Sequence, residues 1–136
     1  MKNKLTISCS RSNLCRVRKH LENFLFDRNV DAIKSHSIIL AVDEICANII
    51  IHSHHCNPTH TIEMSTEINH EKELVIVIRD RGNAFDLSNY KEPNIKDLVS
   101  SNKKGGLGLM LVKRIMDEIE FCNENNHNIC RLKKLL

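Results

Sequence analysis

Glu44 and Asn48 lie four residues apart in a long apolar segment and form the first pair of side chains here that could do chemistry. In a helix this spacing puts the carboxylate and the amide on one face. Leu40, Ala47 and Ile51 flank the pair, so the helix is apolar on nearly every side and is expected to be buried or to line a cavity. A carboxylate there needs a partner such as a metal ion, a water or a hydroxyl. A solvated surface pair is the alternative, since such pairs are common.

Asp80 is the second candidate, because it follows the apolar, β-branched run of residues 73–79 and begins the sequence Asp-Arg-Gly-Asn-Ala-Phe-Asp. A carboxylate at the end of a buried strand can accept a hydrogen bond from an exocyclic amine, such as that of adenine. Gly82 would leave room for a ring to pass the backbone. A plain turn at the strand end is the alternative, because Asp and Gly both favour turns.

The third candidate is the segment of residues 103–109, which reads Lys-Lys-Gly-Gly-Leu-Gly-Leu and is expected to open a helix. Free backbone N–H groups and the positive end of a helix dipole bind phosphate at such a place, and the lysines add positive charge. The segment lacks the Gly-Lys-Ser/Thr ending of a Walker A loop. A long loop rather than a strand precedes it, unlike a dinucleotide-binding fingerprint. A flexible loop before a helix is the alternative.

Hydrophobic periodicity predicts the elements that must position these residues. Helices are expected over residues 11–28, 31–54 and 107–118. Strands, mostly joined by hairpins, are expected over residues 5–8, 61–68, 73–79, 120–122 and 128–132. Between residues 80 and 104 we expect a loop with one helical turn near residues 95–100; loops this long usually bind or cover a ligand. This order predicts an α+β two-layer sandwich of about three helices on a mixed or antiparallel sheet.

Taken in order, the three motifs resemble the N, G1 and G2 boxes of the GHKL ATPases, the superfamily of gyrase, the heat-shock chaperone, histidine kinases and MutL. The sequence is most similar to the bacterial serine-kinase anti-sigma factors. Residues 41–52 resemble their A-V-x-E-x-x-x-N-x-x-x-H helix, residues 80–86 their D-x-G-x-x-F-D motif, and residues 105–117 their G-G-L-G-L-x-L-x-x-x-x-M-D motif. The resemblance covers nearly the whole chain and implies one histidine-kinase-like domain, residues 1–136, with a Bergerat-type ATP-binding fold.

The resemblance also implies a role for each matching residue. Asn48 would bind Mg²⁺, and Glu44 would act as general base on the attacking hydroxyl. Asp80 would bind the adenine amine, and Gly82 would shape the base pocket. The residues closing over the phosphates of ATP would be Lys104, Gly105, Gly106, Leu107, Gly108 and Leu109.

The function implied by the resemblance is that of an ATP- and Mg²⁺-dependent serine protein kinase that is also an anti-sigma factor. Such kinases phosphorylate a serine of an anti-anti-sigma protein of the STAS type and sequester a sigma factor, usually as a homodimer. One alternative is a nucleotide-binding anti-sigma module without kinase activity. Another is the ATPase part of a sensor histidine kinase, although we find no separate helical region carrying a phospho-accepting histidine.

The sequence departs from this family just after the N box. The family often has His-Ala-Tyr there, whereas residues 52–55 read His-Ser-His-His, which changes the rim of the pocket. With Cys56 and His60 nearby, these histidines raise the question of a zinc site. Their spacing is crowded at a helix end, so we expect solvated histidines favoured by the helix dipole instead.

Composition limits the remaining classes. The chain has 136 residues, 41% of them hydrophobic, and a net charge of +3, which fits one soluble domain with its own core. No basic block is larger than Lys133-Lys134, and no apolar run approaches the roughly 18 residues of a membrane span. We therefore expect a cytoplasmic protein without a nucleic-acid or membrane partner. The six cysteines lack regular spacing, so reduced thiols are expected, with a disulfide framework as the alternative.

Overall fold

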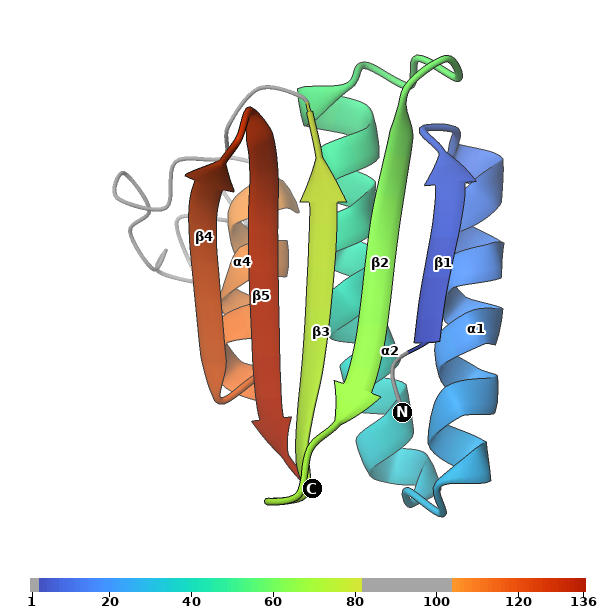
Figure 1. Ribbon diagram of the computed structural model, residues 1–136, viewed down its shortest axis with the longest axis vertical. Coiled ribbons are helices and arrows are strands. Elements are labelled where there is room, and N and C mark those ends of the chain that lie inside the picture. The colour runs from blue at the N-terminus through green and yellow to red at the C-terminus, as the bar shows by residue number, and fades with distance from the viewer. Residues whose placement is uncertain (1–2, 82–103) are drawn as a thin grey trace.

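The computed structural model describes residues 3–81 and 104–136. The loop expected after Asp80, with its helical turn near residues 95–100, falls outside these ranges apart from its two ends. Within them the helices form one layer and the strands another, as Figure 1 shows. In chain order the elements are β1 (Asn3–Ser8), η1 (Arg11–Asn13), α1 (Leu14–Asp27), α2 (Ala32–Asn48), η2 (Ile49–Ser53), β2 (Thr61–Ile68), β3 (Glu73–Asp80), α4 (Lys104–Ile115), β4 (Glu118–Glu124) and β5 (His127–Leu135).

The strands form one five-stranded sheet in the order β1-β2-β3-β5-β4, with antiparallel pairing between all of these neighbours. β3 is central, as its β-branched run predicts. Alternate residues of this strand point toward the helices, and Leu74, Ile76 and Ile78 are buried there. The predicted α+β sandwich is therefore confirmed, in its antiparallel form.

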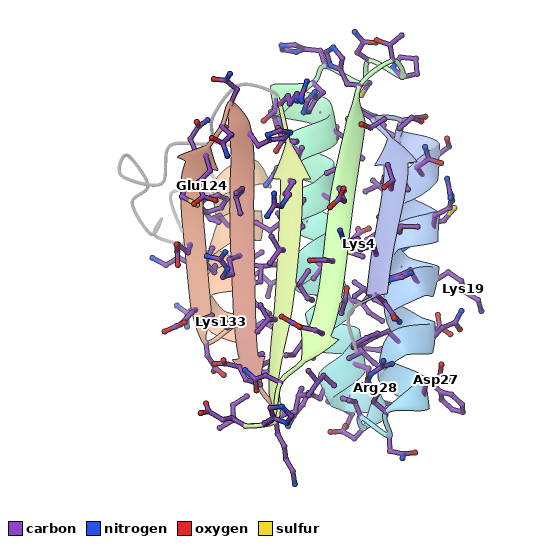
Figure 2. The ribbon with its side chains drawn as sticks, viewed as in Figure 1. Lys4, Lys19, Asp27, Arg28, Glu124 and Lys133 are labelled. Atoms are coloured by element: carbon purple, nitrogen blue, oxygen red, sulfur yellow. The ribbon has the colours of Figure 1, made fainter. Side chains whose placement is uncertain are left out.

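The other face of the sheet is open and carries charged side chains, several of which are visible in Figure 2. Lys4 Nζ lies 3.8 Å from a carboxylate oxygen of Glu63 on the neighbouring strand. Lys133 Nζ likewise lies 3.5 Å from Glu118. Each exposed ion pair stabilises the fold little. The pairs nevertheless show which of the alternating residues of the strands face solvent.

α2 is the central helix of its layer and packs on the sheet between α1 and α4. One carboxylate oxygen of Asp31 accepts hydrogen bonds from the N–H groups of Ile33, at 2.9 Å, and Lys34, at 3.1 Å. This cap explains why the helix begins at Ala32, since the first N–H groups of a helix have no partner within it. The buried residues of α2 are Ile38, Ala41, Val42, Ile45 and Cys46.

The helix expected over residues 31–54 changes its hydrogen-bond pattern near its end. α2 stops at Asn48, and η2 continues it as a turn of π-helix that closes with a bond from the N–H of His54 to the carbonyl of Ile49, at 3.1 Å. A π-turn is wider than an α-turn and changes the direction in which the next side chains project. His54 leaves this turn pointing at the end of β3.

The continuous helical segment Ala32–Ser53 has 22 residues and is long and apolar enough to cross a membrane by length and composition. Its uninterrupted apolar runs are nevertheless shorter than the roughly 18 residues of a membrane span, because residues such as Asp43 and Glu44 interrupt them. In this fold the segment lies against the sheet between two other helices. A core helix of a soluble protein meets the same criterion.

α4 lies three residues earlier in the chain than expected, over Lys104–Ile115 instead of residues 107–118. Its glycines therefore belong to the first turns of the helix and do not precede it. The earlier end follows from pairing in the sheet, because the N–H of Asp117 bonds to the carbonyl of Lys133 at 2.9 Å and starts β4 there.

The closing hairpin of β4 and β5 is longer than predicted. Its turn contains Asn125 and Asn126, whose φ angles of 52° and 65° lie in the left-handed region that asparagine tolerates. The six cysteines are free thiols, as expected from their irregular spacing.

We predict that Asp31→Ala lowers the free energy of unfolding by about 1 kcal/mol, because it removes the cap of the central helix. Urea denaturation measures this change. Asp27→Ala is the matched control: this exposed carboxylate at the end of α1 makes no hydrogen bond within the described residues, and equal losses in both variants would contradict the capping role.

Candidate nucleotide-binding site

The structure brings Glu44 and the glycine-rich motif together. Glu44 is half-buried on α2 and faces Gly108 on α4. A Cβ atom placed on Gly108 would overlap the carboxylate of Glu44, and it would lie 2.7 Å from the Glu44 Cγ. A larger residue at position 108 would have to displace the Glu44 side chain, so glycine allows this close approach of the α4 backbone to the carboxylate.

Burial is the main cause that raises the pKa of the Glu44 carboxyl above its ordinary value. The neighbouring charge of Asp43 raises it further, whereas His52 acts in the opposite direction. Asp43 itself is held by Arg18, whose guanidinium lies 2.9 Å from its carboxylate. A carboxylate with a raised pKa is a stronger proton acceptor, which suits a general base.

Asn48 is half-buried at the last position of α2, one helical turn beyond Glu44. Its amide makes no hydrogen bond with the rest of the described chain. An amide oxygen suits Mg²⁺, which usually keeps several waters and binds the phosphates of the substrate besides one or two protein ligands. Residues 3–81 and 104–136 contain no group of three His, Cys, Asp or Glu side chains that could hold a metal by themselves.

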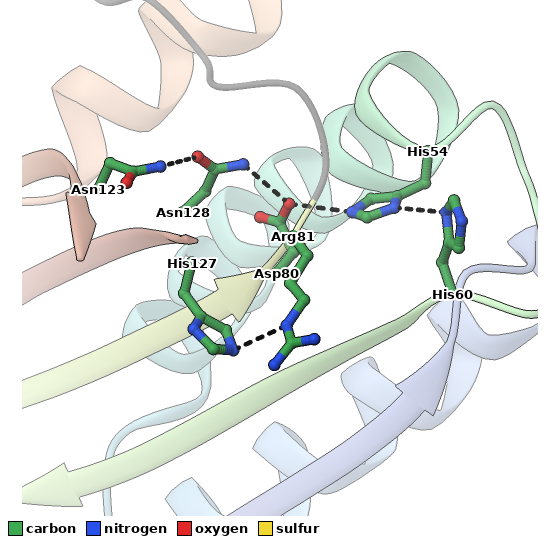
Figure 3. Close-up of polar contacts among 7 residues, drawn as sticks. All are labelled: His54, His60, Asp80, Arg81, Asn123, His127 and Asn128. Atoms are coloured by element: carbon green, nitrogen blue, oxygen red, sulfur yellow. Dashed lines mark hydrogen bonds and ion pairs between the residues drawn. The ribbon is translucent and has the colours of Figure 1, made fainter. Parts of the chain in front are cut away.

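Asp80 is the buried carboxylate at the end of β3, with 6% of its surface exposed. Figure 3 shows it between two donors from different elements. His54 Nε2 lies 2.9 Å from Asp80 Oδ1, and Asn128 Nδ2 lies 3.3 Å from the same oxygen. Asn128 is the residue of β5 that pairs directly with Asp80 in the sheet, so the register itself supplies this second donor.

A chain of polar side chains extends from Asp80 in both directions. On one side, His54 Nδ1 lies 2.9 Å from His60 Nδ1, and Asn57 reaches the other ring nitrogen of His60 at 3.5 Å. On the other side, Asn123 Nδ2 donates to Asn128 Oδ1 at 3.0 Å.

His54, His60 and Asn128 were not recognised in the sequence as parts of a site. The prediction of solvated histidines fits His52 and His55, which are exposed, but it is wrong for His54, of which only 3% is exposed. His54 is buried because the π-turn before it directs its side chain toward Asp80. Hydrophobic periodicity in the sequence does not predict a π-turn.

The outer border of this network is a cavity of about 490 Å³ at the top of the open sheet face. Arg81 and His127 line it, together with His54 and Asp80. Arg81 Nε donates to His127 Nε2 at 3.1 Å. Because successive residues of a strand point to opposite faces, Arg81 lies on the open face while Asp80 faces the helices.

The remaining predicted site residues are placed only in part. Gly82 lies outside the described residues. Lys104, Gly105, Gly106 and Leu107 form the first turn of α4, whose first four N–H groups have no partner within the helix. The Leu109 side chain is 3% exposed and packs in the hydrophobic core, so only its backbone could face a ligand.

This fold and these motifs define a family. Residues 8–134 match the family described as the histidine kinase-like ATPase domain, and the chain belongs to that family. The kinases named serine-protein kinase RsbW are among its relatives. That of Halalkalibacterium halodurans is 30% identical over 107 residues, which are 73% of this chain and 61% of that protein. That of Oceanobacillus iheyensis is 30% identical over 89 residues, 62% of this chain and 56% of that protein.

The chain thus spans less than two thirds of these two RsbW relatives, at 56% and 61% of their lengths. An anti-sigma F factor of Heyndrickxia coagulans is 26% identical over 142 residues, covering 100% of this chain and 95% of that protein.

Two solved structures share the fold. The structure of the RsbU and RsbW domains of a Mycobacterium tuberculosis protein matches 98% of this chain and 32% of its own, with a TM-score of 0.69 at 12% identity. The SiaB–SiaC complex of Pseudomonas aeruginosa matches 98% of this chain and 89% of its own, with a TM-score of 0.63 at 13% identity. These likenesses support the assignment of the fold.

We predict that Gly108→Ala has opposite effects in two backgrounds. Next to Glu44 the added methyl overlaps the carboxylate, at a cost of about 1–3 kcal/mol. In the Glu44→Ala protein the overlapping atoms are absent, and the same change should stabilise the helix by about 1 kcal/mol. Urea denaturation of the two single variants and the double variant measures the coupling. Additive effects would show that the two residues do not touch.

Proposed function

We propose that this protein is an ATP- and Mg²⁺-dependent serine protein kinase whose nucleotide site lies between the end of α2, the end of β3 and the start of α4. The observation that carries the proposal is the contact of Gly108 with Glu44. It puts a candidate base beside the helix whose first N–H groups are available to phosphate. Membership of the histidine kinase-like ATPase family supports the use of ATP.

Each predicted residue keeps the role inferred from the sequence. Asp80 accepts a hydrogen bond from the adenine amine, and Gly82 shapes the base pocket. Asn48 is the protein ligand of Mg²⁺, which neutralises phosphate charge when bound. The phosphates contact the first turns of α4, through Lys104, Gly105, Gly106, Leu107, Gly108 and the backbone of Leu109.

Glu44 takes the proton of the substrate serine as the serine Oγ attacks the γ-phosphorus. A bond forms between Oγ and the phosphorus, the bond to the β–γ bridging oxygen breaks, and ADP leaves with that electron pair. The half-buried position of Glu44 raises its pKa and so strengthens it as a proton acceptor, provided it is ionised before the reaction.

The names of the relatives suggest the kind of partner. We propose that the substrate is an anti-anti-sigma protein of the STAS type, that the kinase sequesters a sigma factor, and that it acts as a cytoplasmic homodimer. The relatives named RsbW and anti-sigma F factor support these assignments.

Nucleotide binding is the first testable consequence. Mg-ADP at about a hundred times its dissociation constant should add about 2.7 kcal/mol to the free energy of unfolding, a shift of several degrees in Tm. Asp80→Asn should abolish most of this shift, because an amide no longer offers two acceptor oxygens to the base. A scan without Mg²⁺ gives the contribution of the metal. Absence of any shift in the wild type would refute the nucleotide site.

Phosphoryl transfer is tested with Glu44→Gln and a STAS-type substrate. The variant should bind Mg-ADP normally but lose transfer by about 100-fold or more, because general-base catalysis contributes about 10²–10⁴-fold. In the wild type the rate should fall as pH drops through the raised pKa of Glu44, since protonation removes the base. Wild-type protein that binds ADP and a sigma factor yet transfers no phosphate would be the regulatory module without kinase activity.

A further inference from the structure

One choice of histidine tautomers directs all the hydrogen bonds around Asp80 toward its carboxylate. An ionised carboxylate can only accept hydrogen bonds, so the Nε2 of His54 must carry a proton and donate it. In a neutral ring the Nδ1 of His54 then accepts, which makes His60 Nδ1 the donor of the 2.9 Å contact between the rings. His60 Nε2 is thereby the acceptor that faces the amide of Asn57.

The hydrogen bonds on the other side of Asp80, through Asn128 and Asn123, have the same direction. Asn128 donates its amide N–H to Asp80 Oδ1 and accepts at Oδ1 from Asn123. Both hydrogen-bonded series therefore end on one carboxylate oxygen of Asp80, to which the dashed lines of Figure 3 lead. These hydrogen bonds replace the water that the buried carboxylate loses.

The acceptor oxygens of Asp80 determine which base the site can recognise. A carboxylate oxygen accepts a hydrogen bond from the exocyclic amine of adenine, but it repels the carbonyl oxygen that hypoxanthine and guanine have in its place. A site that leaves a buried polar group unpaired discriminates strongly against the wrong ligand.

We propose that His54 determines the base specificity of the nucleotide site by donating to Asp80 and so keeping that carboxylate a pure acceptor. This inference rests on the proposed function, in which Asp80 contacts the base. His54 acts through Asp80 and is a positioning residue. With 3% of its surface exposed, it is held in place by the π-turn before it and by His60 beyond it.

Two buried thiols near Asp80 do not supply a competing charge. Burial raises the pKa of Cys9 to about 11 and that of Cys130 to about 12, and the negative charge of Asp80 adds to both shifts. Both thiols are neutral near pH 7. Arg81 and His127 pair with each other on the opposite face of the sheet.

The test compares the affinities for Mg-ATP and Mg-ITP, which differ in the exocyclic amine and carbonyl of the base. Calorimetric titration of the wild type should give at least about 100-fold preference for ATP. His54→Phe keeps a buried ring but removes the donor, and the preference should fall at least about tenfold.

Two further variants separate specificity from folding. His54→Gln retains an amide donor and should restore the preference to within about threefold of the wild type. His60→Ala changes an exposed residue, so it should keep the fold while allowing His54 to adopt its other tautomer, and the preference should fall severalfold. His70→Ala, at an exposed histidine in the turn after β2, is the matched control.

The outcomes are distinguishable. A wild type that binds ATP and variants that keep the same ATP-to-ITP ratio would overturn the role of His54 and leave the nucleotide site standing. Equal weakening of ATP and ITP binding in His54→Phe would also overturn it, since it would indicate only a structural role. A wild type that binds neither nucleotide would refute the proposed function and this inference together.

Discussion

The burial of α2 is the constraint on which the rest of this structure depends. The helix is apolar on most sides, so the sheet, α1 and α4 must all cover it. Asp43, Glu44 and Asn48 lie toward its C-terminal end, where Gly108 of α4 comes close to the Glu44 carboxylate. The same packing that stabilises the fold thus leaves Glu44 half-buried beside the first turns of α4, and burial gives that carboxyl its raised pKa.

The buried carboxylate of Asp80 at the end of β3 has an energetic cost of its own. A charged carboxylate that loses its water is expensive unless donors replace the water. His54 and Asn128 provide them from a π-turn and from a neighbouring strand. The network orients the acceptor that the proposed function assigns to adenine. Stability and recognition therefore depend on the same hydrogen bonds.

The sequence predicted the architecture well because the architecture depends on patterns that are local. The alternation in β2 and β3 and the helical period of α1 and α2 each reflect burial of one face, and the structure confirms them. The predicted bounds of α4 were wrong by three residues. The hydrogen bond between Asp117 and Lys133 determines where this helix ends, and it joins segments that are distant in the sequence. Residue spacing could not decide whether the histidines of residues 52–60 bind zinc or what His54 contacts. Both depend on the directions of the side chains, which the π-turn changes.

The sequence by itself determined the fold class, the family and the residue types that the candidate site would need, because those follow from periodicity and from motifs within short segments. Only the tertiary structure decided which of these residues meet. Glu44 touches Gly108, and Asp80 receives His54 and Asn128, through contacts between segments far apart in the chain. Burial, hydrogen-bond direction and pKa are properties of such contacts, so they exist only once the layers have packed.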